Sequence, residues 1–289
     1  MIKNLFISMR PRQWTKNLII FAGLIFSQNL GHPLLLAKTI VAFILFCAIS
    51  GAVYIINDLL DYSSDQLHPV KKRRPIASGA LPRPAALTAA VILGFAGSAL
   101  SFLINPPFGA VALSYLLLML GYSLWLKRLV IIDVFVIAAG FVLRAAAGAE
   151  AVNVPISDWL LICVILLSLF LALAKRRQEM KTLENGAAAY RQALSDYSDK
   201  LLDQMIAVVT AAVAVSYSLY TMWPETVEKF GSSNLKYSIP IVLYGIFRYL
   251  YLIYRKDQGE QPEMVLLNDR WLLSSVVAYV LAVWMIIYL

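Results

Sequence analysis

The hydrophobic residues of this chain fall in long uninterrupted runs that are separated by short polar connections. An apolar run of about 20 residues is long enough to cross a bilayer as an α-helix. The short segments of alternating hydrophobicity that are typical of a β-barrel do not occur. The pattern therefore predicts an all-α integral membrane protein with nine transmembrane helices, at residues 17–31, 38–60, 84–104, 107–126, 130–149, 158–175, 203–223, 238–255 and 271–288.

The composition supports this prediction. Of the 289 residues, 60% are hydrophobic and only 15% are charged, whereas a soluble domain carries roughly 25% charged residues. No stretch has the composition of a separate soluble domain, so we expect a single membrane domain over residues 1–289.

Lysine and arginine are concentrated on one side of the predicted membrane. The N-terminal segment and the connections 61–83, 127–129, 176–202 and 256–270 carry most of them, while the opposite connections carry only Lys38, Lys229 and Lys236. Cytoplasmic loops are enriched in Lys and Arg. We therefore expect a multi-pass protein of the inner or plasma membrane with a cytoplasmic N-terminus. The same topology explains the net charge of +8, so we expect a membrane and no nucleic acid as partner.

The second predicted span ends in an acidic motif. Asp58, Asp61 and Asp65 are spaced by three and then four residues, which places them on one face of a helix, and Asn57 adds an amide oxygen. One interpretation is a solvated helix end. The other is a metal site, because like charges become favourable around a cation, and hard oxygen donors without His or Cys suit Mg²⁺. Acidic residues at a membrane boundary favour the functional interpretation.

A basic run follows the acidic motif, from Lys71 to Arg74, just before Pro75. Such a run can fix the topology or contact lipid head groups. Beside a magnesium motif it also predicts a phosphate clamp, because guanidinium groups match phosphate geometry. Acidic and basic residues in one loop indicate a substrate that brings both a metal and phosphates.

These residues carry a family resemblance. The motif Asn57-Asp58 with Asp61 and Asp65, a basic loop and then Arg74-Pro75-Ile76 resembles the UbiA superfamily of membrane prenyltransferases. Four further stretches, 9–17, 122–148, 174–179 and 262–270, resemble the decaprenyl-phosphate phosphoribosyltransferase branch of that superfamily. The resemblance covers nearly the whole chain and implies a UbiA-type bundle with a cytoplasmic-facing active site.

The resemblance also implies a reaction. The phosphate of a polyprenyl phosphate would attack the anomeric carbon of 5-phosphoribosyl 1-diphosphate, with Mg²⁺ as cofactor and pyrophosphate as leaving group. Implied catalytic residues are Asp58, Asp61, Lys16 and Lys175, and implied metal ligands are Asn57, Asp58, Asp61 and Asp65. Implied substrate-binding residues are Lys16, Asn17, Tyr54, Lys71, Arg73, Arg74, Lys127, Arg144, Lys175, Arg176, Glu179, Arg191, Tyr197, Asp203, Asp269 and Arg270.

Several of these residues have a structural alternative. Arg144 is expected near the outer end of its span, where it either extends outward to solvent or meets an interior partner such as Glu150 or a substrate phosphate. Lys175 and Glu179 are four residues apart and could form a helix-end ion pair instead of binding phosphate. Asp269 could simply favour the start of the last helix, and Arg270 beside it suggests a paired or ligand-facing role.

Asp196, Asp199 and Asp203 repeat the spacing of the first motif and invite a second metal site. In the branch that the chain resembles, the pattern of Arg191, Leu194, Tyr197 and Asp203 replaces a full aspartate triad. We therefore interpret Asp196 and Asp199 as surface charges, and Tyr197 and Asp203 as site residues.

Two other functions compete with this interpretation. The alternative within the same fold is an aromatic prenyltransferase that uses an isoprenyl diphosphate, but the second loop departs from the usual second Asp-rich motif of such enzymes. A transporter is the alternative from another class, and the clustering of carboxylates at one membrane face argues against it. The lipid length and the formation of a homo-oligomer are left open by the sequence.

Overall fold

The computed structural model describes residues 1–184, 196–256 and 262–288, and all regular elements in these ranges are helices. The described chain divides into two compact units, residues 1–156 and the remainder from residue 157 onward. The chain is thus all-α, as the sequence predicts.

Eight of the described helices are long and apolar enough to cross a membrane. They are α3 (Pro33–Leu60), α5 (Arg83–Ser101), α6 (Pro106–Leu124), α7 (Ile132–Ala151), α8 (Asp158–Glu184), α9 (Asp199–Met222), α11 (Ile239–Lys256) and α13 (Arg270–Tyr288). They correspond to eight of the nine predicted spans, and they make the chain a multi-pass membrane protein.

The predicted count of nine is not confirmed, because the first span is not one long helix. It consists of the 3-10 helix η1 (Pro11–Ile20) and the short α-helix α2 (Phe21–Phe26). The apolar run in this segment extends only from Leu18 to Phe26, between a polar stretch and Ser27-Gln28-Asn29. That run is too short for a spanning helix by itself.

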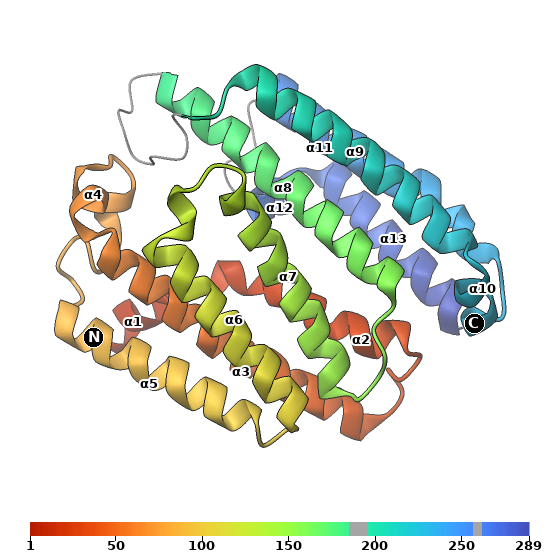
Figure 1. The fold of residues 1–289 in the computed structure, drawn as a ribbon, viewed down its shortest axis with the longest axis horizontal. Helices are drawn as coiled ribbons and strands as arrows, with labels where there is room; N and C mark the ends of the chain where they lie inside the picture. The colour runs from red at the N-terminus through yellow and green to blue at the C-terminus, as the bar shows by residue number, and fades with distance from the viewer. Residues whose placement is uncertain (185–195, 257–261, 289) are drawn as a thin grey trace. The chain divides into compact units, whose positions relative to one another are not determined.

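In the first unit, α3 packs against α5 and α6, and α7 packs against α6, α2 and η1 (Figure 1). Its shorter elements are α1 (Ile2–Ser8), α4 (Tyr62–Leu67), η2 (Lys71–Arg73) and η3 (Leu126–Arg128). A core cluster that includes Ile20, Phe46, Phe108 and Tyr115 joins η1, α3 and α6. Gly148 lets α7 approach η1, because a Cβ there would lie 2.0 Å from the carbonyl oxygen of Ile20.

A second cluster in this unit holds the loop after the acidic motif. Ile76 and Leu81 are 1% exposed and pack with Ile55 of α3 and with Ala86 and Ala90 of α5. Burying such side chains stabilises the folded state by about 1.5–3 kcal/mol each. These two anchors fix the backbone on either side, so the preceding Arg74 has a defined position.

In the second unit, α8 packs against α9, while α11 contacts both α9 and α13. The shorter elements are α10 (Pro224–Phe230), η5 (Asn234–Ser238) and α12 (Pro262–Asn268). Aromatic contacts join its helices: Phe170 of α8 lies against Tyr249 of α11, and Tyr217 of α9 lies against Tyr279 of α13. The Tyr217 hydroxyl also lies 2.6 Å from the Ser238 hydroxyl.

Candidate active site

The acidic motif lies where α3 ends and α4 begins. Asp61 separates the two helices, but its backbone N–H donates to the Asn57 carbonyl at 2.9 Å, and the Asp65 N–H donates to the Asp61 carbonyl at 2.8 Å. Helical hydrogen bonding therefore continues through the junction, so that the three residues follow one another on successive turns. Asp58 and Asp65 are each 3% exposed, which is unusual for acidic side chains without a charged partner.

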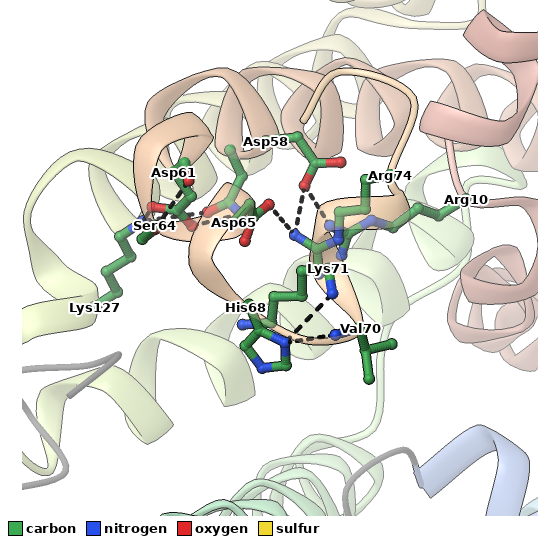
Figure 2. Close-up of polar contacts among 11 residues, drawn as sticks. Arg10, Asp58, Asp61, Ser64, Asp65, His68, Val70, Lys71, Arg74 and Lys127 are labelled. Carbon is green, nitrogen blue, oxygen red and sulfur yellow. Dashed lines mark hydrogen bonds and ion pairs between the residues drawn. The ribbon is translucent and has the colours of Figure 1, made fainter. Parts of the chain in front are cut away.

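Two arginines supply the partners of the buried pair (Figure 2). Arg74 Nη1 donates to Asp58 Oδ1 at 3.0 Å and to Asp65 Oδ2 at 2.6 Å. Arg10, from the segment before η1, donates through Nη2 to the same oxygen of Asp58. Breaking a buried ion pair on one side leaves an uncompensated charge and is strongly destabilising, so these contacts hold three distant segments together.

Asp61 belongs to a separate group of contacts. Lys127 Nζ of η3 lies 2.6 Å from Asp61 Oδ1, and the Asn57 amide donates to Asp61 Oδ2 at 3.0 Å. Lys127 Nζ also lies 3.4 Å from Asn57 Oδ1. Figure 2 shows Lys127 and Asp61 together, with Arg10 and Arg74 gathered on Asp58. The structure thus brings Lys127 to the predicted metal motif from 66 residues away.

The donor set of the motif fits Mg²⁺ in chemistry. Within the described ranges, no three His, Cys, Asp or Glu side chains are grouped so that they could hold a metal together. Mg²⁺, however, is commonly bound by one or two protein carboxylates, with water and substrate phosphate in the other positions. Asp58 and Asp65, which converge on one guanidinium nitrogen, form such a pair of hard oxygen donors.

The basic run divides into side chains with different environments. Arg74 is held on the two aspartates, whereas Lys72 and Arg73 are exposed and Lys71 is half-buried. His68 shapes this turn, since its Nδ1 accepts hydrogen bonds from the backbone N–H groups of Val70 and Lys71 at 3.1 and 3.3 Å. The imidazole therefore contacts the loop backbone here.

Arg144 is not near solvent, so the outward-extending alternative is wrong. Its side chain is buried, and its Nε donates to Asn17 Oδ1 at 2.8 Å and its Nη2 to the Tyr115 hydroxyl at 2.6 Å. Its Nη1 donates to the Gly140 carbonyl at 3.1 Å. The interior partners are therefore these neutral groups and not the suggested Glu150. Because Asn17 also donates to Ser50 Oγ at 3.2 Å, Arg144 ties η1 to α3, α6 and α7.

Two more predicted residues lie near these groups. The Arg10 guanidinium carbon lies 5.0 Å from the centre of the Tyr54 ring, which is a cation–π distance. Lys16 is half-buried in η1, one residue before the buried Asn17.

In the second unit, the end of α8 contains a charged group. Lys175 Nζ lies 3.7 Å from Glu179 Oε1, as the four-residue spacing predicts. Arg176 is 1% exposed, and its Nη1 donates to the other carboxylate oxygen of Glu179. Glu179 thus holds both neighbouring cations.

Arg177 and Asp203 form a further pair in this unit. Arg177 Nε donates to Asp203 Oδ1 at 2.5 Å, and the Tyr254 hydroxyl donates to the same oxygen at 2.9 Å. The Arg177 guanidinium carbon lies 4.1 Å from the centre of the Tyr254 ring. Arg177 Nη1 is buried without a hydrogen-bond partner, so the two N–H donors of this nitrogen are unsatisfied.

The other residues of the second loop are placed in part. Tyr197 is buried, Asp196 is exposed, and Asp199 begins α9. Arg191 lies outside the described residues. Over the ranges that the structure describes, Asp203 joins no group of three metal-ligating side chains, so the suggested second metal site gains no support.

Asp269 caps α13, as its structural alternative suggests. Its Oδ1 accepts from the Leu272 N–H at 2.8 Å, and Arg248 of α11 donates to Oδ1 at 3.1 Å and to Oδ2 at 2.7 Å. These hydrogen bonds, chiefly the one from Arg248, lower the pKa of the Asp269 carboxyl. Arg270 is exposed, with its guanidinium 5.3 Å from the Trp271 ring centre.

Sequence reasoning did not select Arg10, Arg177 or Tyr254 as site residues. Arg10 lies inside the stretch 9–17 that carries the resemblance, and that was the available signal. Arg177 stands beside the selected Arg176, but only a structure can show which of two adjacent cations has a spare donor. Tyr254 contacts Asp203 across 51 residues, a separation over which spacing is uninformative.

Comparison with known proteins identifies the family to which this chain belongs. Residues 17–273 match the model of the UbiA prenyltransferase family. The match covers most of the chain, and the chain therefore belongs to this family.

The similarity is more specific than the family. The chain is 31% identical over 282 residues to decaprenyl-phosphate phosphoribosyltransferase of Mycobacterium tuberculosis, covering 96% of this chain and 91% of that protein. It is 32% identical to the protein of the same name from Corynebacterium glutamicum, covering 98% and 86%. The fold resembles a UbiA homolog from Archaeoglobus fulgidus bound to GPP and Mg²⁺, with a TM-score of 0.73 and 15% identity over 99% of this chain and 100% of that one.

Proposed function

We propose that this protein transfers 5-phosphoribose from 5-phosphoribosyl 1-diphosphate to a polyprenyl phosphate, and releases pyrophosphate. The product is polyprenyl-phosphoryl ribose 5-phosphate. The observation that carries the proposal is the nearly full-length similarity to relatives named decaprenyl-phosphate phosphoribosyltransferase. The basic residues around the acidic motif agree with two substrates that both carry phosphate.

The chemistry requires little from acid–base groups. A phosphate oxygen of the lipid forms a bond to the anomeric carbon, the bond from that carbon to the diphosphate oxygen breaks, and the electron pair leaves with pyrophosphate. The nucleophile is already an anion at neutral pH, so the main tasks of the protein are positioning and charge stabilisation.

The residues of the first unit have matching roles in this proposal. Asp58 and Asp65, with Asp61 and Asn57 beside them, would hold Mg²⁺, which when bound would offset the negative charge that grows on the leaving pyrophosphate. Arg74 and Lys127 already contact these carboxylates and would reach diphosphate oxygens. Lys71 and Arg73 lie in the same loop and would bind further phosphate oxygens.

The second unit also carries candidate phosphate-binding cations. Lys175, Arg176 and Arg177 follow one another at the end of α8, and Arg177 has a donor without a partner. We assign these residues to substrate phosphate. We also place the N-terminus in the cytoplasm and the protein in the plasma membrane, because the basic connections lie on the N-terminal side.

The test is a transfer assay on the purified protein in detergent. Polyprenyl phosphate and radiolabelled 5-phosphoribosyl 1-diphosphate are incubated with and without Mg²⁺, and label is measured in the organic phase. We expect Mg²⁺-dependent label that falls about 100-fold or more in Asp58→Ala and in Asp61→Ala, as when a charge-stabilising group is removed from an active site.

Asp158→Ala is the matched control, because this exposed aspartate lies at the start of α8 and away from the motif in sequence. The Asp158→Ala protein should transfer as much label into the organic phase as the unchanged protein does. Absence of label with several lipid lengths, together with Mg²⁺-dependent transfer of an isoprenyl group to an aromatic acid, would contradict the proposal.

A further inference from the structure

Arg10 has a backbone conformation that is rare for its residue type. Its φ and ψ are 54° and 66°, in the left-handed region, where a side chain with a Cβ is unfavourable. Residues in such conformations persist only when the surrounding structure holds them, and they cluster at functional sites. At Arg10 the conformation turns the chain between α1 and η1.

The segment around Arg10 is anchored both on α3, which carries Asp58, and on the loop that follows Arg74. The Met9 side chain packs on α3 at Gly51, where a Cβ would lie 3.0 Å from Met9 Cε. The Asn4 amide donates to the Ala80 carbonyl at 2.8 Å, in the loop that follows Arg74. These contacts, with the Arg10 N–H bonded to the Ile7 carbonyl at 3.0 Å, hold Arg10 against the acidic motif.

The Arg10 guanidinium shares one carboxylate oxygen with a second guanidinium. Asp58 Oδ1 accepts from Arg10 Nη2 and from Arg74 Nη1, while Arg74 Nη1 also reaches Asp65. Two positive charges thus offset two negative ones around Asp58 and Asp65, which are both buried. A cation that binds these aspartates must compete with both arginines for the same oxygen atoms.

A diphosphate removes this competition. Guanidinium groups pair with phosphate oxygens in a two-pronged geometry and with strong, charge-assisted hydrogen bonds. If a metal arrives together with a diphosphate, each arginine can exchange an aspartate oxygen for a phosphate oxygen. If the metal arrives alone, the displaced arginines lose a buried partner and gain none.

We propose that Arg10 is a diphosphate-binding residue, and that its contact with Asp58 makes the metal and the diphosphate bind together. The proposal rests on the proposed function, in which the acidic motif holds a metal–diphosphate substrate. It predicts weak binding of a divalent cation by the protein alone and much tighter binding when a diphosphate is present.

The test compares Mn²⁺ binding by electron paramagnetic resonance, with and without inorganic pyrophosphate, in the full-length protein and in Arg10→Gly. Glycine is compatible with the left-handed backbone, so the variant removes the guanidinium and keeps the turn. We expect Arg10→Gly to bind Mn²⁺ alone about tenfold or more tightly than the unchanged protein, because a positive charge close to the metal is gone. We expect pyrophosphate to tighten Mn²⁺ binding by Arg10→Gly about tenfold less than it tightens Mn²⁺ binding by the unchanged protein.

Arg12→Gln is the matched control. Arg12 is an exposed cation two residues away, and its replacement should change neither measurement. Arg10→Asn serves as a second neutral variant, since asparagine also tolerates the left-handed region, and melting curves of both variants establish that they fold. Neither measurement uses lipid or sugar, so both test Arg10 whether or not ribose transfer is the reaction.

Two results would overturn the inference. One is Mn²⁺ binding without pyrophosphate that is unchanged or weaker in both folded variants. The other is an enhancement by pyrophosphate that equals that of the unchanged protein, which would show that Arg10 contributes nothing to the diphosphate.

Discussion

Asp269 accepts hydrogen bonds from two directions, from the first turn of α13 and from Arg248 of α11. A carboxylate at a helix N-terminus satisfies a backbone N–H that otherwise has no partner. The bidentate contact with Arg248 adds a link between two helices of the second unit. The sequence suggested a cap or a substrate-binding role for Asp269 but not the ion pair, because Arg248 lies 21 residues away.

This arrangement predicts a pH-dependent stability. Arg248 and the backbone N–H lower the folded-state pKa of Asp269 below its usual value of 3.8. The group therefore stabilises the fold above its unfolded-state pKa, and this stability is lost as the pH falls through the folded-state pKa. In Asp269→Asn, which keeps a capping side chain, we expect a lower melting temperature at pH 7 and a difference that shrinks below about pH 4.

Melting temperatures in detergent between pH 3 and pH 7 check this expectation. Glu228→Gln removes an exposed carboxylate of α10 and serves as control. An Asp269→Asn protein that melts with the unchanged protein at pH 7 would show that the ion pair contributes nothing.

Helix contacts in the first unit depend on small residues at particular crossings. Gly148 of α7 lies so close to η1 that a methyl group would overlap the Ile20 carbonyl oxygen at 2.0 Å. Gly23 of α2 also lies close to the α7 backbone, since a Cβ there would be 2.8 Å from the Ala149 nitrogen. Small residues allow such backbone approaches in membrane proteins. This crossing positions η1, which in turn carries Lys16 and Asn17.

We expect Gly148→Ala to destabilise the protein by about 1–3 kcal/mol or more, because the backbone of η1 cannot move aside as a side chain could. Gly121→Ala in α6 is the matched control, since its Cβ would meet only Leu126 Cδ1 at 3.7 Å. That substitution should be neutral or stabilising by up to about 1 kcal/mol. Thermal unfolding of both variants in detergent measures the difference, and equal stability would refute the crossing as described.

The helices and the acidic motif could be predicted from the sequence because each depends on local information. Hydrophobic runs mark spans, and the spacing of Asp58, Asp61 and Asp65 marks one helical face. The partners could not be predicted, because Arg10 and Lys127 reach the motif from 48 and 66 residues away. The same holds for Arg144, whose neutral partners come from η1 and α6. The first span was predicted as one helix, whereas the structure divides the segment into η1 and α2, because its apolar run is short and has polar neighbours.

At the scale of the whole molecule, the distribution of Lys and Arg predicts the sidedness of every connection. The two native cysteines are first removed as Cys47→Ala and Cys163→Ala. Into this background Ser78→Cys or Ser233→Cys is introduced, because both serines are exposed and lie on opposite predicted sides of the membrane. With a membrane-impermeant maleimide, we expect intact cells to label Ser233→Cys and to label Ser78→Cys only after permeabilisation. The reverse pattern would place the N-terminus and the acidic motif outside the cell.

The pairing of each motif carboxylate with a cation from another segment also has an evolutionary consequence. Asp58, Asp61 and Asp65 are balanced by Arg10, Arg74 and Lys127, which come from three separate segments. A lineage that loses one member of these pairs is left with an uncompensated charge, and a compensating change at the partner position then becomes advantageous. We therefore expect positions 10, 74 and 127 to covary with positions 58, 61 and 65 across the family. Such coupled substitutions would mark the members whose phosphate chemistry has diverged.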